Sequence, residues 1–364
     1  MNQKSHTSTT IKQQQLDEHF MLQAIALAKK GTYTTSPNPA VGCVLVKDSK
    51  IIGQGWHQRA GQGHAEVNAL LDAGKESVGA TAYVTLEPCS HFGRTPPCAK
   101  GLIEAGITRV VVAMQDPNPL VSGRGIAMLE QAGISCTVLV LENAAKQLNP
   151  GFIHRMVKNK PLVRCKMAAS LDGKTAMASG ESKWITGSAA RQDVQNYRAM
   201  SCAIISGADT VLVDDAKLNV RFNELSNIID CADFGFDQQT IRQPIRVIID
   251  TQNRLHPKLA LFQSTSDIIL VRTKLENDHA WPHFVTQLVV KSRNTENGDK
   301  ADLNDLLTQL ALKNINSVWL EAGKTLSGAF IGAGLVDELI LYQAPKLMGN
   351  NSLGLFDIEQ LNKI

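Results

Sequence analysis

The sequence has no long apolar run, no excess of one charge and few aromatic residues. None of its hydrophobic stretches approaches the roughly 18 residues that span a bilayer, and the polar N-terminal segment lacks the apolar core of a secretion signal. Lys and Arg number 37 against 34 Asp and Glu, so no broad cationic surface for nucleic acid or an anionic membrane is expected. We therefore predict a cytoplasmic protein without a nucleic-acid or membrane partner, and a small anionic ligand remains open.

A disulfide framework is also missing. The seven cysteines are odd in number and scattered along the chain, which does not suit paired cysteines. Four of them lie inside apolar runs, where cysteine packs as a small hydrophobic residue. Cys89 and Cys98 instead lie among proline, serine and glycine, so we expect a different role for them.

What the sequence does have is enough apolar material for two cores. The chain has 364 residues, 43% of them hydrophobic, and a domain usually has about 100 to 200 residues. After a polar tail of 16 residues that we expect to be flexible, the first half predicts alternating helices and strands typical of a largely parallel α/β sheet. The predicted elements are a helix over 17–30, a hairpin of 40–46 and 51–56, strands over 81–87, 109–114 and 135–141, and helices from His64, over 98–105 and over 124–132.

The second half predicts another α/β domain. Residues 143–160 are polar and contain Pro150-Gly151, so we interpret them as the connection between domains, with a boundary near 159. Residues 223–243 and 292–302 are polar insertions that we expect to be surface loops. The predicted elements are strands over 162–169, 202–207, 245–250, 267–272, 317–321 and 338–344, and helices over 187–199, 301–313 and 325–333.

A set of zinc ligands stands out in the first half. His64 opens a predicted helix, Cys89 follows a predicted strand, and Cys98 opens the next helix. Three protein ligands leave a position for water, whose pKa zinc lowers toward neutrality, whereas a structural site is closed by a fourth ligand. Glu66, two residues after His64, suits a carboxylate that moves the proton of that water. His91 is a possible fourth ligand, which would close the site.

These residues match the H-x-E and P-C signature of zinc-dependent nucleobase deaminases, except that eight residues separate the two cysteines. That insert, together with Glu87 to Cys98, Ser36 to Gly42, Gly55-Trp56-His57 and Asp116 to Pro119, resembles the deaminase half of the RibD family of bacterial bifunctional riboflavin biosynthesis proteins. The resemblance implies a cytidine-deaminase-like α/β/α domain over 1–159, with one Zn²⁺ held by His64, Cys89 and Cys98 and with Glu66 as general acid and base. It also implies that Asn38 and His57 contact the pyrimidine.

The second half resembles the reductase half of the same family. The matching segments are 166–174, 180–186 and 209–215, and the Gly-rich stretch after 317–321 opens a helix whose N-terminus could hold an anion. The resemblance implies a dihydrofolate-reductase-like α/β domain over 160–364 that uses NADPH. It implies NADPH contacts at Ala168, Trp184, Thr210, Asp214, Thr251, Gly323, Lys324, Thr325, Leu326, Ser327, Gly328 and Ala329. It implies substrate contacts at Ser182, Arg198, Leu218, Arg221 and Glu321.

The family's activity would then be zinc-dependent deamination of 2,5-diamino-6-(5-phosphoribosylamino)pyrimidin-4-one, followed by NADPH-dependent reduction of the ribosyl group to ribityl. The resemblance also implies a homo-oligomer, a dimer or tetramer. The family's chain continues past the equivalent of Leu355-Phe356 with a final strand pair, so we expect a terminal sheet edge of this chain to be missing or supplied differently. Two alternatives remain at this point. One is a nucleic-acid editing deaminase, which the near-neutral charge disfavours. The other is a non-catalytic metal module closed by His91, with a nucleotide-binding regulatory second half.

Overall fold

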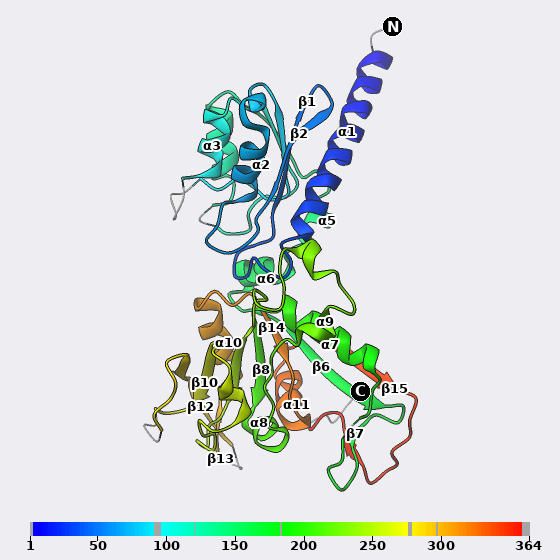
Figure 1. Cartoon of the computed structure of the whole chain (residues 1–364), viewed down its shortest axis with the longest axis vertical. Helices are drawn as coiled ribbons and strands as arrows, with labels where there is room; N and C mark the ends of the chain where they lie inside the picture. The colour runs from blue at the N-terminus through cyan, green and yellow to red at the C-terminus, as the bar shows by residue number, and fades with distance from the viewer. Residues whose placement is uncertain are drawn as a thin grey trace. The chain divides into compact units, whose positions relative to one another are not determined.

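The structure is a computed structural model that describes residues 3–90, 96–119, 121–182, 184–275, 279–295 and 298–358. The chain folds into two compact units (Figure 1). The first comprises Met1–Val157 together with Cys231–Phe236, and the second comprises Lys158–Asp230 and Asp237–Ile364. In the described ranges, no helix combines the length and the hydropathy needed to cross a membrane.

The first unit is a mixed sheet between two layers of helices. Its strands are ordered β2-β1-β3-β4-β5, with β1 antiparallel to β2 and β3, and with β3, β4 and β5 parallel. Helices α2, α3 and α4 pack on one face, and α1, α5 and α6 pack on the other. The bounds are α1 (Gln3–Lys29), β1 (Gly42–Lys47), β2 (Lys50–Trp56), α2 (Ala65–Ala73), η1 (Gly74–Ser77), β3 (Thr81–Val84), α3 (Cys98–Glu104), β4 (Arg109–Val112), α4 (Arg124–Gln131), β5 (Ser135–Val138), α5 (Glu142–Lys146) and α6 (Pro150–Lys158).

Two cores form because side chains alternate along the strands. In β1, Cys43 and Leu45 face the core under α2 to α4, whereas Val44 and Val46 face the core under α1. Gly55 in β2 allows α2 to approach closely, since a Cβ at Gly55 would lie 2.4 Å from the carbonyl oxygen of Ala65. This contact fixes the first turn of α2, where the predicted metal ligand lies.

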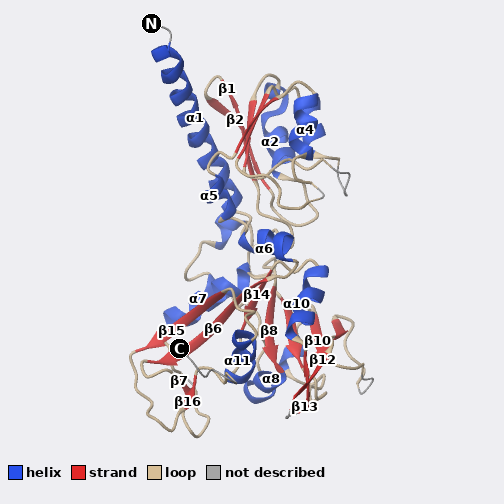
Figure 2. Cartoon of the chain, turned by 180° about the vertical axis from the view of Figure 1, so that it is seen from behind, coloured by secondary structure: helices blue, strands red, loops and turns tan. Residues whose placement is uncertain are grey.

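The second unit is a parallel sheet, also covered on both faces (Figure 2). Its seven strands are ordered β11-β10-β9-β8-β14-β6-β15 within the described residues, and every adjacent pair is parallel. Helices α10 and α11 pack on one face, and α7 and α8 pack on the other. The bounds are β6 (Leu162–Ser170), β7 (Lys174–Ala176), α7 (Ser188–Met200), β8 (Ala203–Gly207), α8 (Ala208–Asp214), α9 (Phe222–Leu225), β9 (Ile245–Ile249), η3 (Ala260–Gln263), β10 (Ile268–Arg272), β11 (Val285–Val289), β12 (Ser292–Thr295), β13 (Gly298–Ala301), α10 (Leu303–Leu312), β14 (Ser317–Leu320), α11 (Lys324–Gly332), β15 (Glu338–Ala344) and β16 (Leu353–Gly354).

Three polar stretches contain regular structure that the sequence did not indicate. The polar N-terminal tail is helical from Gln3, because its glutamines favour a helix and pair along it: Gln13 donates to Asp17 and Gln14 to Glu18, each at 3.0 Å and one turn on. The connecting stretch 143–160 contains α5 and α6, whose apolar side chains pack under the first sheet. The polar insertions contain α9, the 3-10 helix η2 (Cys231–Phe234) and the β12–β13 hairpin.

Candidate functional site

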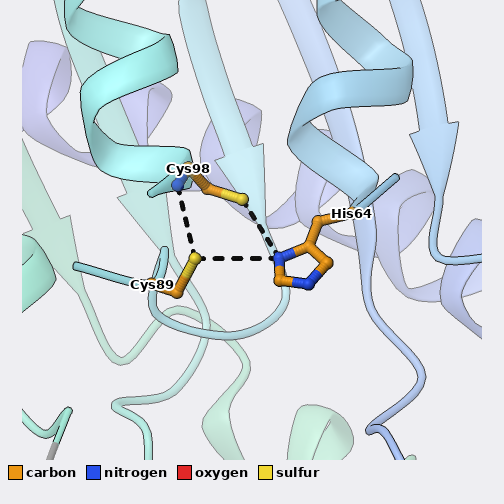
Figure 3. Close-up of side chains that lie close together, drawn as sticks. All are labelled: His64, Cys89 and Cys98. Atoms are coloured by element: carbon orange, nitrogen blue, oxygen red, sulfur yellow. Dashed lines mark hydrogen bonds between the residues drawn. The ribbon is translucent and has the colours of Figure 1, made fainter. Parts of the chain in front are cut away.

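Three side chains from separate parts of the first unit converge at the carboxyl end of β3. His64 is the N-cap of α2, Cys98 is the first residue of α3, and Cys89 follows β3 after Pro88 (Figure 3). The Nδ1 atom of His64 lies 3.2 Å from the Sγ of Cys98 and 3.7 Å from the Sγ of Cys89. All three potential ligand atoms lie within 4.8 Å of one another. The sequence placed these residues in three elements, and the fold brings them together.

The arrangement fits zinc. Tetrahedral Zn²⁺ binds Cys sulfur at about 2.3 Å and His nitrogen at about 2.0 to 2.1 Å, which puts the two ligand atoms about 3.6 Å apart. The two nitrogen–sulfur distances lie on either side of that value. Hydrogen bonds from Cys98 and His64 lower the pKa of Cys89, which favours the thiolate that a metal requires. The possible fourth ligand, His91, lies outside the described residues.

Glu66 lies beside this cluster in the first turn of α2, and its side chain is buried. Burial and the negative charge of Cys89 raise the pKa of Glu66 and the charge of His64 lowers it, which leaves a net pKa of about 7. A carboxyl group whose pKa is near neutrality exchanges a proton readily at physiological pH. Glu66 therefore has both the place and the proton affinity of a general acid and base.

Asn38 and His57, the two expected pyrimidine contacts, lie beside the candidate metal ligands. The Nδ1 of His57 lies 3.1 Å from the carbonyl oxygen of Gly63, which can only accept, so Nδ1 carries the proton and Nε2 accepts from the Asn38 amide at 3.1 Å. Burial lowers the pKa of His57, which keeps the ring neutral. Its ring centroid lies 5.4 Å from that of His64. The two expected pyrimidine contacts thus lie together and next to the candidate metal ligands.

Glu87 is a residue of this site to which the sequence assigned no role. Its buried carboxylate accepts backbone N–H bonds from Gly123 and Gly125 at 2.9 Å each, from Asp116 at 3.2 Å and from Ile126 at 3.4 Å. Glu87 therefore ties the segment that carries Cys89 to the start of α4. The sequence signal that could have indicated it is a glutamate at the end of an apolar strand, directly before Pro-Cys.

In the second unit, the predicted cofactor positions gather at the carboxyl edge of the parallel sheet. Ala168 lies in β6, Thr210 in α8 after β8, Thr251 after β9, and Gly323 is the N-cap of α11 after β14. The four strands are neighbours in the order β9-β8-β14-β6. Nucleotides bind at this edge in open parallel sheets, and the N-terminus of a helix favours phosphate.

The predicted substrate contacts include a buried ion pair. Arg198 of α7 binds Glu321 with two hydrogen bonds, Nε to Oε1 at 2.7 Å and Nη2 to Oε2 at 2.6 Å, and donates to the carbonyl of Asn219 at 2.8 Å. Trp319 donates to Glu321 Oε1 at 2.6 Å. Burial raises the pKa of Glu321, but the charge and hydrogen bonds of Arg198, with smaller contributions from Lys166 and Trp319, together lower it by more, to about 2. This pair is charged throughout the physiological range.

The remaining predicted substrate and cofactor positions differ in their exposure to solvent. Arg221 pairs with Glu224 at 2.6 Å on the surface. Leu218 is buried, whereas Ser182 and Asp214 are exposed. The stretch Gly323 to Ala329 is mostly the first turns of α11 and not a loop. Within it, the side chains of Lys324, Thr325, Leu326 and Ala329 are exposed or half-buried, whereas Ser327 and Gly328 are buried.

A cavity of about 580 Å³ lies beside Trp184, between residues 184–190 and residues 341–346 at the end of β15. The Trp184 side chain is 66% exposed, and the guanidinium of Arg191 lies 4.6 Å from its ring centroid. An exposed aromatic ring held by a cation offers a flat face against which a planar ligand group can stack. The structure therefore places Trp184 at a surface that is open to a ligand.

Comparisons with known proteins match both halves. Residues 14–114 match the cytidine and deoxycytidylate deaminase zinc-binding region, and residues 161–364 match the RibD C-terminal domain. The riboflavin biosynthesis protein RibD of Escherichia coli strain K12 is 51% identical over 96% of this chain and 93% of its own length. RibD of Haemophilus influenzae is 50% identical over 95% and 90%.

Comparison with solved structures gives the same family. The chain matches Acinetobacter baumannii RibD with a TM-score of 0.85 and 45% identity, over 97% of this chain and 94% of that one. It matches a Thermotoga maritima diaminohydroxyphosphoribosylaminopyrimidine deaminase/5-amino-6-(5-phosphoribosylamino)uracil reductase with a TM-score of 0.79 and 35% identity, over 94% and 90%. The expected fold class is therefore confirmed, and the chain belongs to the RibD family of riboflavin biosynthesis proteins.

Proposed function

We propose that the chain is a bifunctional enzyme of riboflavin biosynthesis, with a zinc-dependent deaminase over residues 1–159 and an NADPH-dependent reductase over residues 160–364. The first reaction hydrolyses the amino group of 2,5-diamino-6-(5-phosphoribosylamino)pyrimidin-4-one, and the second reduces the ribosyl group of 5-amino-6-(5-phosphoribosylamino)uracil to ribityl. The observation that carries the proposal is the cluster of His64, Cys89 and Cys98 beside the buried Glu66.

In the deaminase, His64, Cys89 and Cys98 hold Zn²⁺, which when bound acts as a Lewis acid toward the attacking water. A carboxyl oxygen of Glu66 takes a proton from that water and later delivers one to the departing amine. The Asn38 amide and the His57 ring orient the pyrimidine, because they are hydrogen-bonded to each other and held by the backbone of Gly63. Fixed orientation of this kind lowers the entropic part of the barrier.

In the reductase, the residues that hold NADPH are Ala168, Trp184, Thr210, Asp214, Thr251 and the stretch from Gly323 to Ala329 at the start of α11. When bound, NADPH supplies the hydride. The protein's part is to position the ribosyl group and exclude water. Ser182, Leu218 and Arg221 contact the substrate directly. Arg198 and Glu321 hold each other in one geometry, so they offer the substrate a preorganised polar surface and not a mobile cation.

We also propose that the protein is a cytoplasmic homo-oligomer. None of the seven cysteines, all of which the structure describes, forms a disulfide, which suits a reducing compartment. For association, β15 lies at one edge of the second sheet and exposes 48% of Leu339 and 44% of Leu341. Light scattering of the purified protein would test this: a monomer mass would contradict it.

The experiment that tests the function is NADPH oxidation by the zinc-loaded protein supplied with the diaminopyrimidine ribotide, beside a sample stripped of zinc by a chelator. We expect NADPH consumption only with zinc, because the reductase then receives its substrate from the deaminase. Supplying the deaminated uracil ribotide should restore oxidation in the stripped sample. No oxidation with that substrate would refute the reductase assignment.

A further inference from the structure

A short segment that lies within the reductase half of the sequence belongs to the first unit. The chain leaves the second unit after Asp230, contributes Cys231–Phe236 to the first unit, and returns at Asp237. The segment is a compact turn, since η2 covers Cys231–Phe234 and Phe236 N–H donates to the carbonyl of Cys231 at 3.2 Å. It presents two aromatic rings, of Phe234 and Phe236.

Both rings pack against Tyr33. The ring of Phe234 meets that of Tyr33 edge to face, with centroids 4.7 Å apart and an interplanar angle of 89°. The ring of Phe236 lies 5.8 Å from it at 67°. Tyr33 is 7% exposed and Phe236 is 5% exposed, so this is a buried contact. Edge-to-face pairs fix the relative orientation of the rings as well as burying area.

Tyr33 lies in the turn that carries Asn38. In this turn, Thr34 N–H donates to the Gly31 carbonyl at 3.1 Å, and Asn38 N–H donates to the Thr35 carbonyl at 2.9 Å. The turn is also tied to the other pyrimidine-contacting segment, because the Thr34 hydroxyl donates to the carbonyl of Gln58 at 2.5 Å. A displacement of Tyr33 would therefore move both Asn38 and its hydrogen-bond partner, His57.

Gly31, at the start of the turn, shows how close this packing is. A Cβ there would lie 2.8 Å from the carbonyl oxygen of His57 and 2.8 Å from the Thr35 side chain. The turn therefore rests directly on the backbone of His57 and has little room to shift on that side. Phe234 and Phe236 contact the same turn through Tyr33.

We propose that residues 231–236 are a positioning element of the deaminase: the rings of Phe234 and Phe236 hold Tyr33 and so fix the turn that presents Asn38 to the pyrimidine. The inference rests on the proposed deaminase function. It makes a segment from the reductase half of the sequence necessary for substrate binding by the deaminase. The candidate ligand cluster consists of His64, Cys89 and Cys98, and the ring contacts of Phe234 and Phe236 join the segment to the turn through Tyr33.

The test is the KM for the diaminopyrimidine ribotide in the full-length, zinc-loaded protein carrying F234A and F236A together. We expect KM to rise about tenfold, the order expected for the loss of two aromatic contacts. The zinc content should stay the same, kcat should change little, and NADPH oxidation with the deaminated ribotide should be unchanged. A wild-type KM in the double variant would overturn the proposal. If the wild-type protein itself does not deaminate, the proposed function fails, and not this inference alone.

Two further variants separate positioning from stability. Ile134→Ala removes buried volume from the first unit just before β5, at the opposite end of the parallel strands from Cys89, and should lower the unfolding temperature without raising KM. An equal rise in KM in this control would overturn the proposal. F234L with F236L keeps apolar bulk and should fold if the alanine variant does not, and it should show a smaller rise in KM.

A double-mutant cycle with Tyr33→Ala completes the test. If the rings act through Tyr33, adding F234A and F236A to Tyr33→Ala should raise KM no further, so the effects are not additive. Fully additive effects on KM would mean that residues 231–236 act by another route, and would refute the proposal.

Discussion

At the scale of single residues, the first unit owes its chemistry to a few side chains placed by element ends. His64 and Cys98 begin helices, and Cys89 follows a strand, so their backbones are held by regular structure within one to five residues. Glu66 is different, because its side chain is buried without being a member of the ligand cluster. A catalytic zinc site needs a carboxyl group that is not a metal ligand, whereas a structural zinc site does not.

Glu66→Gln should abolish deamination while the protein still binds zinc. The amide cannot accept and return a proton, and general acid–base catalysis typically contributes about 10² to 10⁴ in rate. The measurement is ammonia release, with zinc content by atomic absorption and NADPH oxidation with the deaminated ribotide as controls. Retained deamination would refute the role of Glu66 as general acid and base.

Glu87→Gln should loosen the segment that carries Cys89. The carboxylate accepts hydrogen bonds from four backbone N–H groups. In the variant, the side-chain NH₂ group would point at one or more of these N–H groups, and two donors cannot form a hydrogen bond with each other. Leaving buried donors unsatisfied costs about 1 to 3 kcal/mol of unfolding free energy. Chemical denaturation and zinc affinity by competition would measure both effects. The exposed Glu104→Gln in α3 is the control and should change neither.

At the scale of elements, helix α1 is anchored to the sheet by one buried ion pair. Asp17 accepts two hydrogen bonds from Arg109 of β4 at 2.7 Å each, and one from the Tyr83 hydroxyl of β3 at 3.0 Å. Burial raises the pKa of Asp17, but the bonds from Arg109, Gln13 and Tyr83 lower it by more, so the net pKa lies below 3.8. The anchor thus requires the ionised carboxylate.

Asp17→Asn should therefore destabilise the first unit in a pH-dependent way. A depressed folded-state pKa contributes stability above the unfolded-state pKa near 4, and this contribution is lost as the pH falls through the folded value. We expect the variant to lose about 1 to 3 kcal/mol at pH 7 and much less near pH 3, where the wild-type contribution is also fading. Urea unfolding at several pH values would show it. The half-buried Glu18→Gln, whose hydrogen bond with Gln14 is exposed, should lie within about 0.5 kcal/mol of wild type at pH 7.

The Arg198 and Glu321 pair links α7 to the end of β14 in the same manner. Glu321→Gln would leave the Arg198 charge buried without its partner, which costs about 3 to 5 kcal/mol. We expect a lower unfolding temperature of the second unit together with loss of NADPH oxidation, while ammonia release persists. Unchanged reduction would show that the pair is not needed by the reductase.

At the scale of the whole molecule, each unit has its own hydrophobic cores. The clusters under the first sheet and those under the second share no residue. Units with separate cores unfold as separate cooperative transitions, and a ligand raises the unfolding temperature only of the unit that binds it.

Calorimetry should therefore show that removal of zinc lowers the unfolding temperature of one transition and leaves the other in place. Zinc binding to ordered ligands stabilises the folded state of the first unit, so a chelator removes that contribution. NADPH should raise the other transition alone. A single transition that shifts with both ligands would contradict this.

Much of this organisation could be predicted from the sequence, because it depends on local properties. Hydrophobic periodicity indicated every strand of the two large sheets except β11, and the H-x-E and Pro-Cys motifs indicated the ligands His64, Cys89 and Cys98. The polar stretches 1–16, 143–160 and 223–243 showed no periodicity that indicated an element, but a few apolar side chains and i to i+4 pairs suffice for helices there.

Only the tertiary structure decided which polar groups are partners. Arg198 and Glu321 are 123 residues apart, and the sequence offered both simply as contacts of the substrate. The same holds for Glu87 with the start of α4, and for residues 231–236 with Tyr33. Periodicity and motifs report what a residue is suited to do, whereas the pairing of distant side chains follows from the packing of whole elements. The sequence therefore determined the two folds and the metal chemistry, and the fold determined how the sites are held.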